Sequence, residues 1–246
     1  MAYVLKTNLA NKKNYGSARA LSVIKYIVIH YTGNDGDTDE NNGNYFKNHI
    51  VEASAHYFVD DDSVTQSVPD NYVAWAVGGK RYSDYKTSGG AKLYGKANNT
   101  NSLSVEICDD VKNGVVYPSQ ATIENAVALV KELQKKYNIP NENVIRHFDV
   151  NGKKCPKYWV DNAKWETEFK SKLVTKTESE EYDMPTIKKG SKGKAVKIWQ
   201  IIVGTTPDGD FGTKTDTATR LWQKKMGLVV DGIVGKKSWK AGLDSV

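Results

Sequence analysis

The chain has 246 residues and a formal net charge of +6, with 39% hydrophobic and 26% charged residues. This composition is typical of a globular protein and excludes a disordered or fibrous chain, and the length suffices for one full domain and a small second one. Two cysteines are too few for a disulfide framework, no stretch approaches the roughly 18 apolar residues of a membrane span, and the first 20 residues lack the apolar segment of a secretory signal. We therefore expect a protein that is made in the cytoplasm without an export signal and does not insert into a membrane.

The larger, N-terminal region alternates between strand and helix patterns. Val23 to His30 is a near-continuous β-branched run, typical of a strand buried on both faces. The other predicted elements are a hairpin over 57–68, a strand over 101–108, a helix over 119–137 with Ser119 as its N-cap, a short strand over 143–147 and a helix over 163–173. This order predicts an α/β fold, with a central and mostly buried β-sheet flanked by helices.

A charged, poorly apolar segment over 174–184 predicts an interdomain linker, so we expect one domain over 1–173 and another over 185–246. The smaller region repeats the pattern Asp-Gly-x-x-Gly, starting at Asp208 and again at Asp231, and a helical segment follows each turn. Its predicted helices span 194–202, 213–226 and 236–243. A small three-helix domain results, with an aromatic-rich core expected from Trp199, Leu221, Trp222 and Trp239.

The smaller region is also basic, with 12 Lys and Arg against 5 Asp and Glu over 185–246. Such a charge suggests a polyanionic partner, either nucleic acid or an anionic cell-wall polymer, although a solvated lysine-rich surface explains it equally well. Glycine-rich turns and buried tryptophans favour a compact ligand-binding domain over a nucleic-acid binder.

Three side chains predict a metal site. His30 ends a predicted strand, at the edge of an α/β sheet where ligands usually bind, and His147 ends another. Cys155 follows past an Asn-Gly turn that lets the chain fold back. Two imidazoles and a thiolate give Zn²⁺ three protein ligands and leave the fourth position for water, as in catalytic zinc sites. A Cys108–Cys155 disulfide is the alternative, and we consider it the weaker one because it would consume the ligand thiolate.

Three further polar residues are candidates for the chemistry. Glu106 lies inside an apolar strand, where a carboxylate is costly to bury without a partner or a task. If it faces the metal, it can move the proton of an attacking water; if that face of the strand is wet, it is an ordinary surface residue. Asp149 would fix the tautomer of His147, and Lys153 would place a positive charge near an oxyanion. Solvated surface positions are equally expected for Asp149 and Lys153.

Four motifs resemble the type 2 N-acetylmuramoyl-L-alanine amidase family, which also includes phage lysozyme-type amidases and peptidoglycan recognition proteins. They are IVIHYT around His30, SAHYFVD over 54–60, SLSVEIC around Glu106, and RHFD followed by KKCP over 146–156. The resemblance spans residues 20–170 and keeps the motifs in family order. It implies a zinc enzyme that hydrolyses the amide bond between N-acetylmuramic acid and L-alanine in bacterial peptidoglycan.

The resemblance also implies a role for each matching residue. The implied zinc ligands are His30, His147 and Cys155, the implied catalytic carboxylate is Glu106, and Lys153 matches the basic residue of the family. His56 falls where some members have a catalytic Tyr, so we expect it to be a donor to the tetrahedral intermediate.

One departure and one agreement bear on activity. Many members of the family have a His directly after the Trp of the segment that corresponds to residues 73–78. In this chain Trp75 is followed by Ala76 instead, so any substrate contact made by that His is absent. Non-catalytic recognition relatives commonly lack the ligand Cys, which this chain has. A non-catalytic peptidoglycan-binding protein remains the alternative to the hydrolase.

Residues 185–246 resemble the three-helix peptidoglycan-binding domain that is often attached to wall hydrolases. The matching segments are KKGSKGKAVKIWQ over 188–200, DGDFGTKT over 208–215 and GLVVDGIVGKKSW over 227–239. The expected partner is therefore peptidoglycan or a related cell-wall polymer, with no nucleic acid and no obligate protein partner. Together the two regions indicate a phage endolysin or an autolysin that acts on the cell wall after its release.

Overall fold

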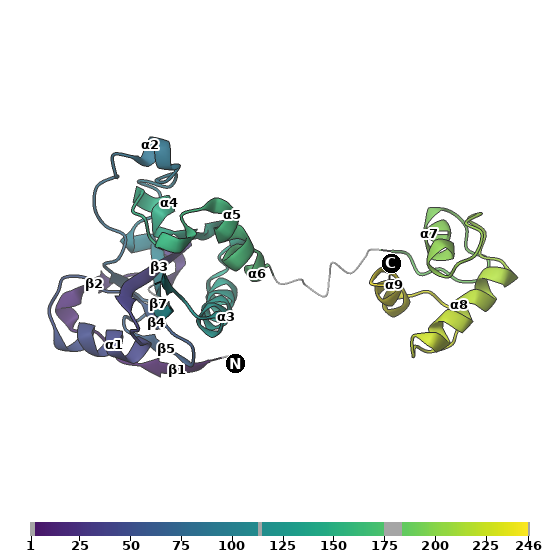
Figure 1. Cartoon of the computed structure of the whole chain (residues 1–246), viewed down its shortest axis with the longest axis horizontal. Helices are drawn as coiled ribbons and strands as arrows, with labels where there is room; N and C mark the ends of the chain where they lie inside the picture. The colour runs from purple at the N-terminus through teal and green to yellow at the C-terminus, as the bar shows by residue number, and fades with distance from the viewer. Residues whose placement is uncertain (1–2, 113–114, 175–183, 246) are drawn as a thin grey trace. The chain divides into compact units, whose positions relative to one another are not determined.

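The computed structural model describes residues 3–112, 115–174 and 184–245. The chain divides into two compact units, Met1–Val174 and Thr175–Val246 (Figure 1). The linker predicted over 174–184 lies outside the described residues except for its two end positions. Across the described ranges, no helix is long and apolar enough to span a membrane.

The larger unit is built around one sheet. Its strand order is β1 (Val4–Thr7), β5 (Ser63–Gln66), β4 (Tyr57–Val59), β7 (Ser102–Lys112), β3 (Tyr26–Asp35) and β9 (Val144–Arg146), and β8 (Val115–Tyr117) pairs with the end of β7. The predicted hairpin is the antiparallel pair of β4 and β5, and β7 and β8 are also antiparallel, while the other neighbours are parallel. A second, two-stranded sheet pairs β2 (Tyr15–Ala18) with β6 (Tyr72–Ala74).

Helices lie around this sheet (Figure 1). They are α1 (Asp39–Asn48), α2 (Tyr85–Ser88), α3 (Gln120–Tyr137), α4 (His147–Asn151), α5 (Asn162–Trp165) and α6 (Ser171–Leu173), with a π-helical segment over Glu166–Lys170. Short 3₁₀ turns span Lys12–Asn14, Leu21–Val23, Asn99–Asn101, Asn141–Asn143 and Lys157–Trp159. The α/β class predicted from the sequence is confirmed.

The alternation of side chains in β3 and β7 separates the core from the site. The main hydrophobic core contains Ile27 and Ile29 of β3, Leu103 of β7 and one face of α3. Successive residues of a strand point to opposite faces of the sheet. His30 and Glu106, which lie at the other parity, therefore point away from α3, and the core on one face of the sheet supports a polar site on the other.

The smaller unit has the three expected helices, α7 (Lys194–Ile202), α8 (Thr213–Lys225) and α9 (Lys236–Leu243). The indole rings of Trp199 and Trp239 are buried with centroids 5.2 Å apart, and Trp222 packs against Trp199 at 4.9 Å. Leu221 was expected in this core and is 66% exposed instead. The buried face of α8 contains Thr219, and a residue two positions later on a helix points to nearly the opposite side.

The two Asp-Gly turns of the smaller unit are held by the same hydrogen bonds. The side chain of Gln200 donates to Asp208 Oδ1 (2.7 Å), and its oxygen accepts from the backbone N–H of the following glycine (2.9 Å). Gln223 makes the equivalent bonds around Asp231, both at 2.9 Å. Both glutamines are buried, so the 23-residue repeat of the sequence is a structural duplication with a polar residue at the centre of each copy.

Candidate metal and active site

Two adjacent parallel strands set the positions of the first site residues. His30 of β3 is directly opposite Glu106 of β7. The strand containing His30 continues to Asp35, so the expected strand end at His30 is wrong. Pairing with β9 nevertheless stops at Ile29, and His147 is the residue after β9 and begins α4. Both histidines therefore lie at the end of β9, where β3 continues without its β9 partner.

A chain reversal brings Cys155 to the same place. Helix α4 ends before Gly152, which has a φ of 91° in the left-handed region that glycine adopts most readily. The backbone N–H of Phe148 then donates to Cys155 O at 2.9 Å. The Asn-Gly dipeptide predicts this return of the chain.

The three predicted metal ligands converge. The ligand atoms of His30, His147 and Cys155 all lie within 4.8 Å of one another, and each residue is at most 3% exposed. Cys155 Sγ is 3.8 Å from His30 Nδ1, and the two imidazole centroids are 4.7 Å apart. Glu106 Oε1 is 3.7 Å from His30 Nδ1, which places the carboxylate beside the three ligands.

Several buried polar atoms at this point lack hydrogen-bond partners. Among the described residues, His30 Nε2, both ring nitrogens of His147 and Glu106 Oε2 have none. A buried polar atom without a partner costs about 1–3 kcal/mol, so such a concentration is unusual in a native fold. Two imidazoles and a thiol are the donor set that zinc prefers, and the residues present therefore fit a metal ion.

Burial sets the protonation of these groups. It lowers the pKa of His30 well below the ordinary value, with the His147 ring and Lys153 adding to the effect, and it lowers the pKa of His147 to about 3. Both rings are therefore neutral near pH 7, which is the form that binds metals. Burial raises the pKa of the Cys155 thiol, so a thiolate at this position requires a nearby cation.

Glu106 and Lys153 complete the group. Burial raises the pKa of Glu106 to about 8, while the charge of Lys153 opposes this shift. Lys153 itself is exposed. It lines two cavities that open beside the ligands, so the structure brings it to the mouth of the site.

His56 does not occupy the place expected of it. Its ring is fully buried, Nδ1 accepts from the backbone N–H of Ser104 (3.0 Å), and Nε2 lies 3.1 Å from Tyr72 O and 2.9 Å from Arg19 Nη2. Burial and the Arg19 charge lower the pKa of His56 to about 3, so the ring is neutral. Because Nδ1 accepts a hydrogen bond, Nε2 carries the proton and donates to Tyr72 O. No ring nitrogen is left for a substrate, and the structure does not support the expected catalytic donor.

Asp149 also has a different partner from the expected one. Its carboxylate accepts from Arg146 Nη2 (2.7 Å) and Nε (2.9 Å), and not from the His147 ring. Arg146 is 3% exposed and also donates to Trp159 O at 2.7 Å. This buried ion pair fastens the start of α4 to the segment that follows Cys155.

Replacement of Arg146 by Gln should lower the free energy of unfolding of the larger unit by about 3–5 kcal/mol, because Asp149 would be left as an unpaired charge. Calorimetric unfolding of the full chain measures this effect. Lys164→Gln, which removes a positive charge from an exposed position, is the control and should change the free energy of unfolding by less than about 0.5 kcal/mol. A loss below about 1 kcal/mol for Arg146→Gln would show that the pair does not hold the segment.

Sequence reasoning missed the walls of the two cavities. The first, which we call the lysine pocket, has a volume of about 490 Å³ and is lined by Lys80, Lys153 and His147, among others. The second, which we call the α1 pocket, has a volume of about 530 Å³ and contains Tyr45 and Glu106. The signal that could have located the first pocket is the glycine pair Gly78-Gly79 followed by two basic residues.

Comparison with known proteins identifies the family. A model of the N-acetylmuramoyl-L-alanine amidase family matches residues 20–158, and one described as a peptidoglycan binding domain matches residues 199–241. The amidase CwlL of Bacillus licheniformis is 32% identical over 247 residues, which cover 90% of this chain and 66% of CwlL. The amidase BlyA of Bacillus subtilis (strain 168) is 34% identical over 160 residues, which cover 63% of this chain and 42% of BlyA.

Solved structures of related proteins support the same family assignment. The catalytic domain of XlyA has a TM-score of 0.53 at 27% identity, covering 69% of this chain and 98% of that domain. The structure of PlyL has a TM-score of 0.54 at 30% identity, covering 70% of this chain and 97% of the PlyL chain. Because the amidase model spans more than half of the sequence, the chain belongs to the N-acetylmuramoyl-L-alanine amidase family. The chain spans slightly less than two thirds of CwlL and less than half of BlyA.

Proposed function

We propose that this protein is a zinc-dependent N-acetylmuramoyl-L-alanine amidase, which hydrolyses the amide bond between N-acetylmuramic acid and L-alanine in bacterial peptidoglycan. One observation carries the proposal. Three buried ligand atoms within 4.8 Å of one another lie beside the partly buried carboxylate of Glu106, in a chain of the amidase family.

His30, His147 and Cys155 would hold the ion. A zinc ion bound there supplies a Lewis acid for the amide carbonyl and lowers the pKa of water. The neutral imidazoles have lone pairs that are not used by other described groups. A cation would also offset the cost of a buried thiolate at Cys155.

Glu106 acts as the general base and then as the general acid. It accepts the proton of the attacking water and transfers it to the nitrogen of L-alanine as the amide bond breaks. Burial raises the pKa of Glu106, and the charge of a cation held by the three ligands would lower it again, toward the ionised form that accepts a proton. Lys153 places its positive charge near the oxyanion that develops on the carbonyl oxygen.

The smaller unit binds the cell wall and keeps the active site near its substrate, since tethering raises the effective concentration. The protein would act on the wall after release, as an endolysin or an autolysin. A non-catalytic recognition protein is the competing function. The complete ligand set and the adjacent Glu106 favour the enzyme.

Digestion of purified cell walls tests the proposal. We expect new amino termini of L-alanine, identified by mass spectrometry, together with a fall in turbidity. Chelation should abolish this release and added Zn²⁺ should restore it. Binding to walls without new termini would favour the recognition protein, and full activity in a metal-free sample would overturn the zinc requirement.

A further inference from the structure

Two cavities of opposite character meet at Lys153. The lysine pocket contains Lys80 and His147 in addition to Lys153. The α1 pocket contains the carboxylates Glu106 and Asp37. A substrate whose scissile amide lies over the ligands between them would have one half in each pocket, and the two pockets attract different chemical groups.

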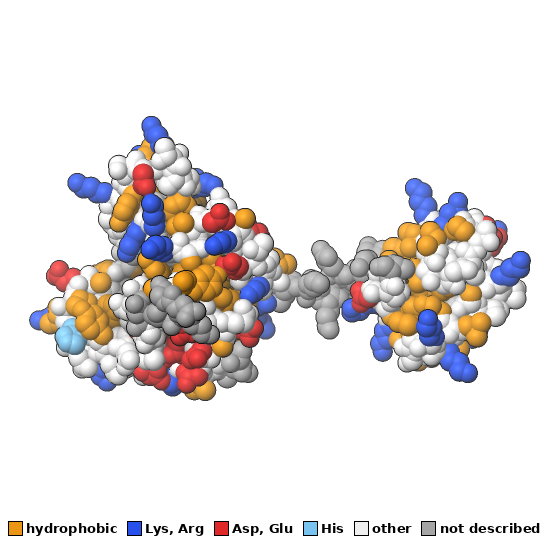
Figure 2. Space-filling model, viewed as in Figure 1, with side chains coloured by type: hydrophobic (Ala, Val, Ile, Leu, Met, Phe, Trp, Pro, Cys, Tyr) orange, Lys and Arg blue, Asp and Glu red, His pale blue; other side chains and the backbone are white. Residues whose placement is uncertain are grey.

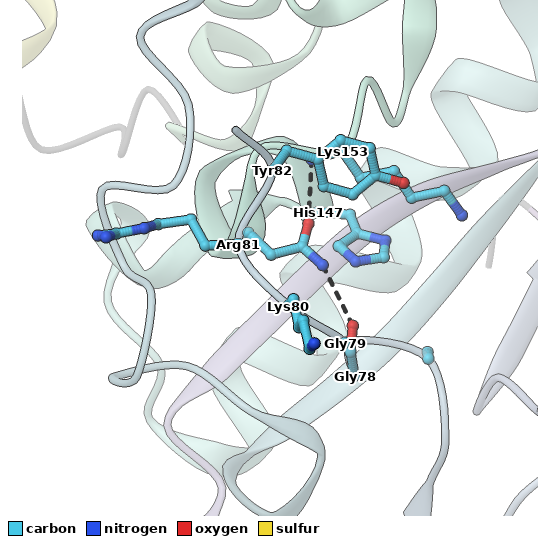
Figure 3. Close-up of a pocket in the computed structure, with 9 residues that line it drawn as sticks. Gly78, Gly79, Lys80, Arg81, Tyr82, His147 and Lys153 are labelled. Atoms are coloured by element: carbon cyan, nitrogen blue, oxygen red, sulfur yellow. Dashed lines mark hydrogen bonds between the residues drawn. The ribbon is translucent and has the colours of Figure 1, made fainter. Parts of the chain in front are cut away.

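The two lysines of the lysine pocket are free to attract an anion. Within the part of the chain that the structure describes, neither Lys80 nor Lys153 forms an ion pair, and both are exposed. Figure 3 shows these two side chains flanking the His147 ring, while Arg81 extends away from it. The Arg81 guanidinium instead packs over the ring of Tyr85, 3.9 Å from its centroid. In Figure 2, Lys and Arg side chains gather over this part of the larger unit, around α2 and α4.

A buried side chain fixes the wall of this pocket. Asn151 is 3% exposed, its Nδ2 donates to Gly78 O (3.1 Å), and its Oδ1 accepts from the backbone N–H of Lys153 (3.0 Å). The backbone N–H of Tyr82 donates to Asn151 O at 2.8 Å. The segments that contain Lys80 and Lys153 are therefore tied to one another through Asn151, on a support that includes the metal-ligand helix α4.

The α1 pocket offers a different surface. Its walls include the rings of Tyr45, Phe46 and Phe58 and the amide side chain of Asn41. Aromatic rings beside amides suit the apolar faces and hydroxyl groups of a sugar, whereas the Asp37 carboxylate in the same wall repels another carboxylate. The charged half of a substrate therefore belongs in the lysine pocket.

We propose that the lysine pocket binds the peptide side of the substrate and that Lys80 is a specificity-determining residue, which favours peptides with a free carboxylate on the residue after L-alanine. This inference rests on the proposed amide hydrolysis. A carboxylate gains Coulomb energy from Lys80 and Lys153, and a carboxamide at the same place does not. Because both ammonium groups are exposed, the preference is expected to be about fivefold.

Two disaccharide peptides test the inference. They differ only in whether the residue after L-alanine has a free α-carboxylate or a carboxamide. The full-length protein with zinc should cleave the carboxylate form with a kcat/KM about fivefold higher, and this ratio should decrease at high salt. Lys80→Gln should reduce this ratio without abolishing it, because Lys153 remains, and it should act mainly through the rate on the carboxylate form.

Lys86→Gln is the matched control, because it removes the same charge from the exposed surface of α2. It should leave the ratio unchanged. Equal rates of the wild-type chain on the two substrates, or a ratio that Lys80→Gln leaves unchanged, would overturn the inference while leaving the amidase intact. Failure to release L-alanine termini from either substrate would overturn the proposed function itself.

Discussion

Replacement of Glu106 by Gln should reduce kcat by roughly 10²–10⁴-fold, because the carboxamide keeps the size of the side chain but cannot accept the proton of the attacking water. Zinc should remain bound, since Glu106 is beside the three ligands and is not one of them. The release of L-alanine termini gives kcat, and the metal content of the purified variant gives the occupancy.

Glu142→Gln makes the same chemical change at an exposed position and should leave both quantities as in the wild-type chain. A Glu106→Gln variant with zinc bound and unchanged kcat would refute the role of this residue in proton transfer. Loss of zinc together with activity would assign Glu106 to the assembly of the metal site instead.

The best predicted elements are those whose periodicity and end signals agree. Helix α3 begins after Ser119, whose side chain accepts from the backbone N–H of Thr122, and it ends at Tyr137 as expected. Helices α7 and α9 have the predicted bounds. In each of these segments, local propensity, the hydrophobic face and the turn residues indicate the same structure.

Helix α1 was not predicted, because its signal is tertiary. It is a polar segment with a glycine at its centre and few apolar residues. Gly43 is required by packing, since a Cβ there would lie 2.9 Å from Thr65 Cγ2 of β5. A central glycine disfavours a helix in a sequence-based prediction, and only the neighbouring strand explains it.

The site was predictable where chemistry and spacing restrict the choice. His30, His147 and Cys155 belong to a chain with few histidines and two cysteines, so a shared metal site could be inferred. The partners of His56 and Asp149 could not, because a hydrogen bond to a backbone atom or to Arg146 leaves no pattern in the sequence. The lysine pocket likewise joins segments more than 60 residues apart.

The repeat in the smaller unit was also predictable only in part from the sequence. The two Asp-Gly turns were visible in the sequence, whereas Gln200 and Gln223 were overlooked although they have the same 23-residue spacing. Their importance depends on burial, since each satisfies a turn from inside the core. A glutamine that recurs at the same spacing as a repeated turn therefore indicates a buried side chain that hydrogen-bonds to that turn.

Replacement of Cys155 by Ala should weaken zinc binding at least about 100-fold and abolish activity at ordinary zinc concentrations, because even loss of a group that only supports a ligand costs 10–100-fold. Zinc affinity is measured by competition with a chelator, and activity by the release of L-alanine termini.

Cys108→Ala is the matched control, since it removes the other buried thiol of the chain, whose Sγ is 3.7 Å from Asn42 Nδ2. It should keep zinc and activity. Equal affinities for Cys155→Ala and the wild-type chain would exclude the thiolate as a ligand.

The pH dependence of zinc affinity provides a sharper test of the same assignment. Burial raises the pKa of the Cys155 thiol, so near pH 7 the thiol is protonated without metal and must release its proton when zinc binds. Zinc affinity of the wild-type chain should therefore fall as the pH decreases, by about tenfold per pH unit for one released proton. In Cys155→Ala this proton is absent, and both imidazoles are already neutral because burial lowers the pKa of each. Glu106, with its pKa raised to about 8, can lose a proton in either protein when a cation binds beside it. The pH slope of the variant should therefore be lower than that of the wild-type chain by about one proton, whereas an equal slope in both proteins would assign the thiol's proton to a different group.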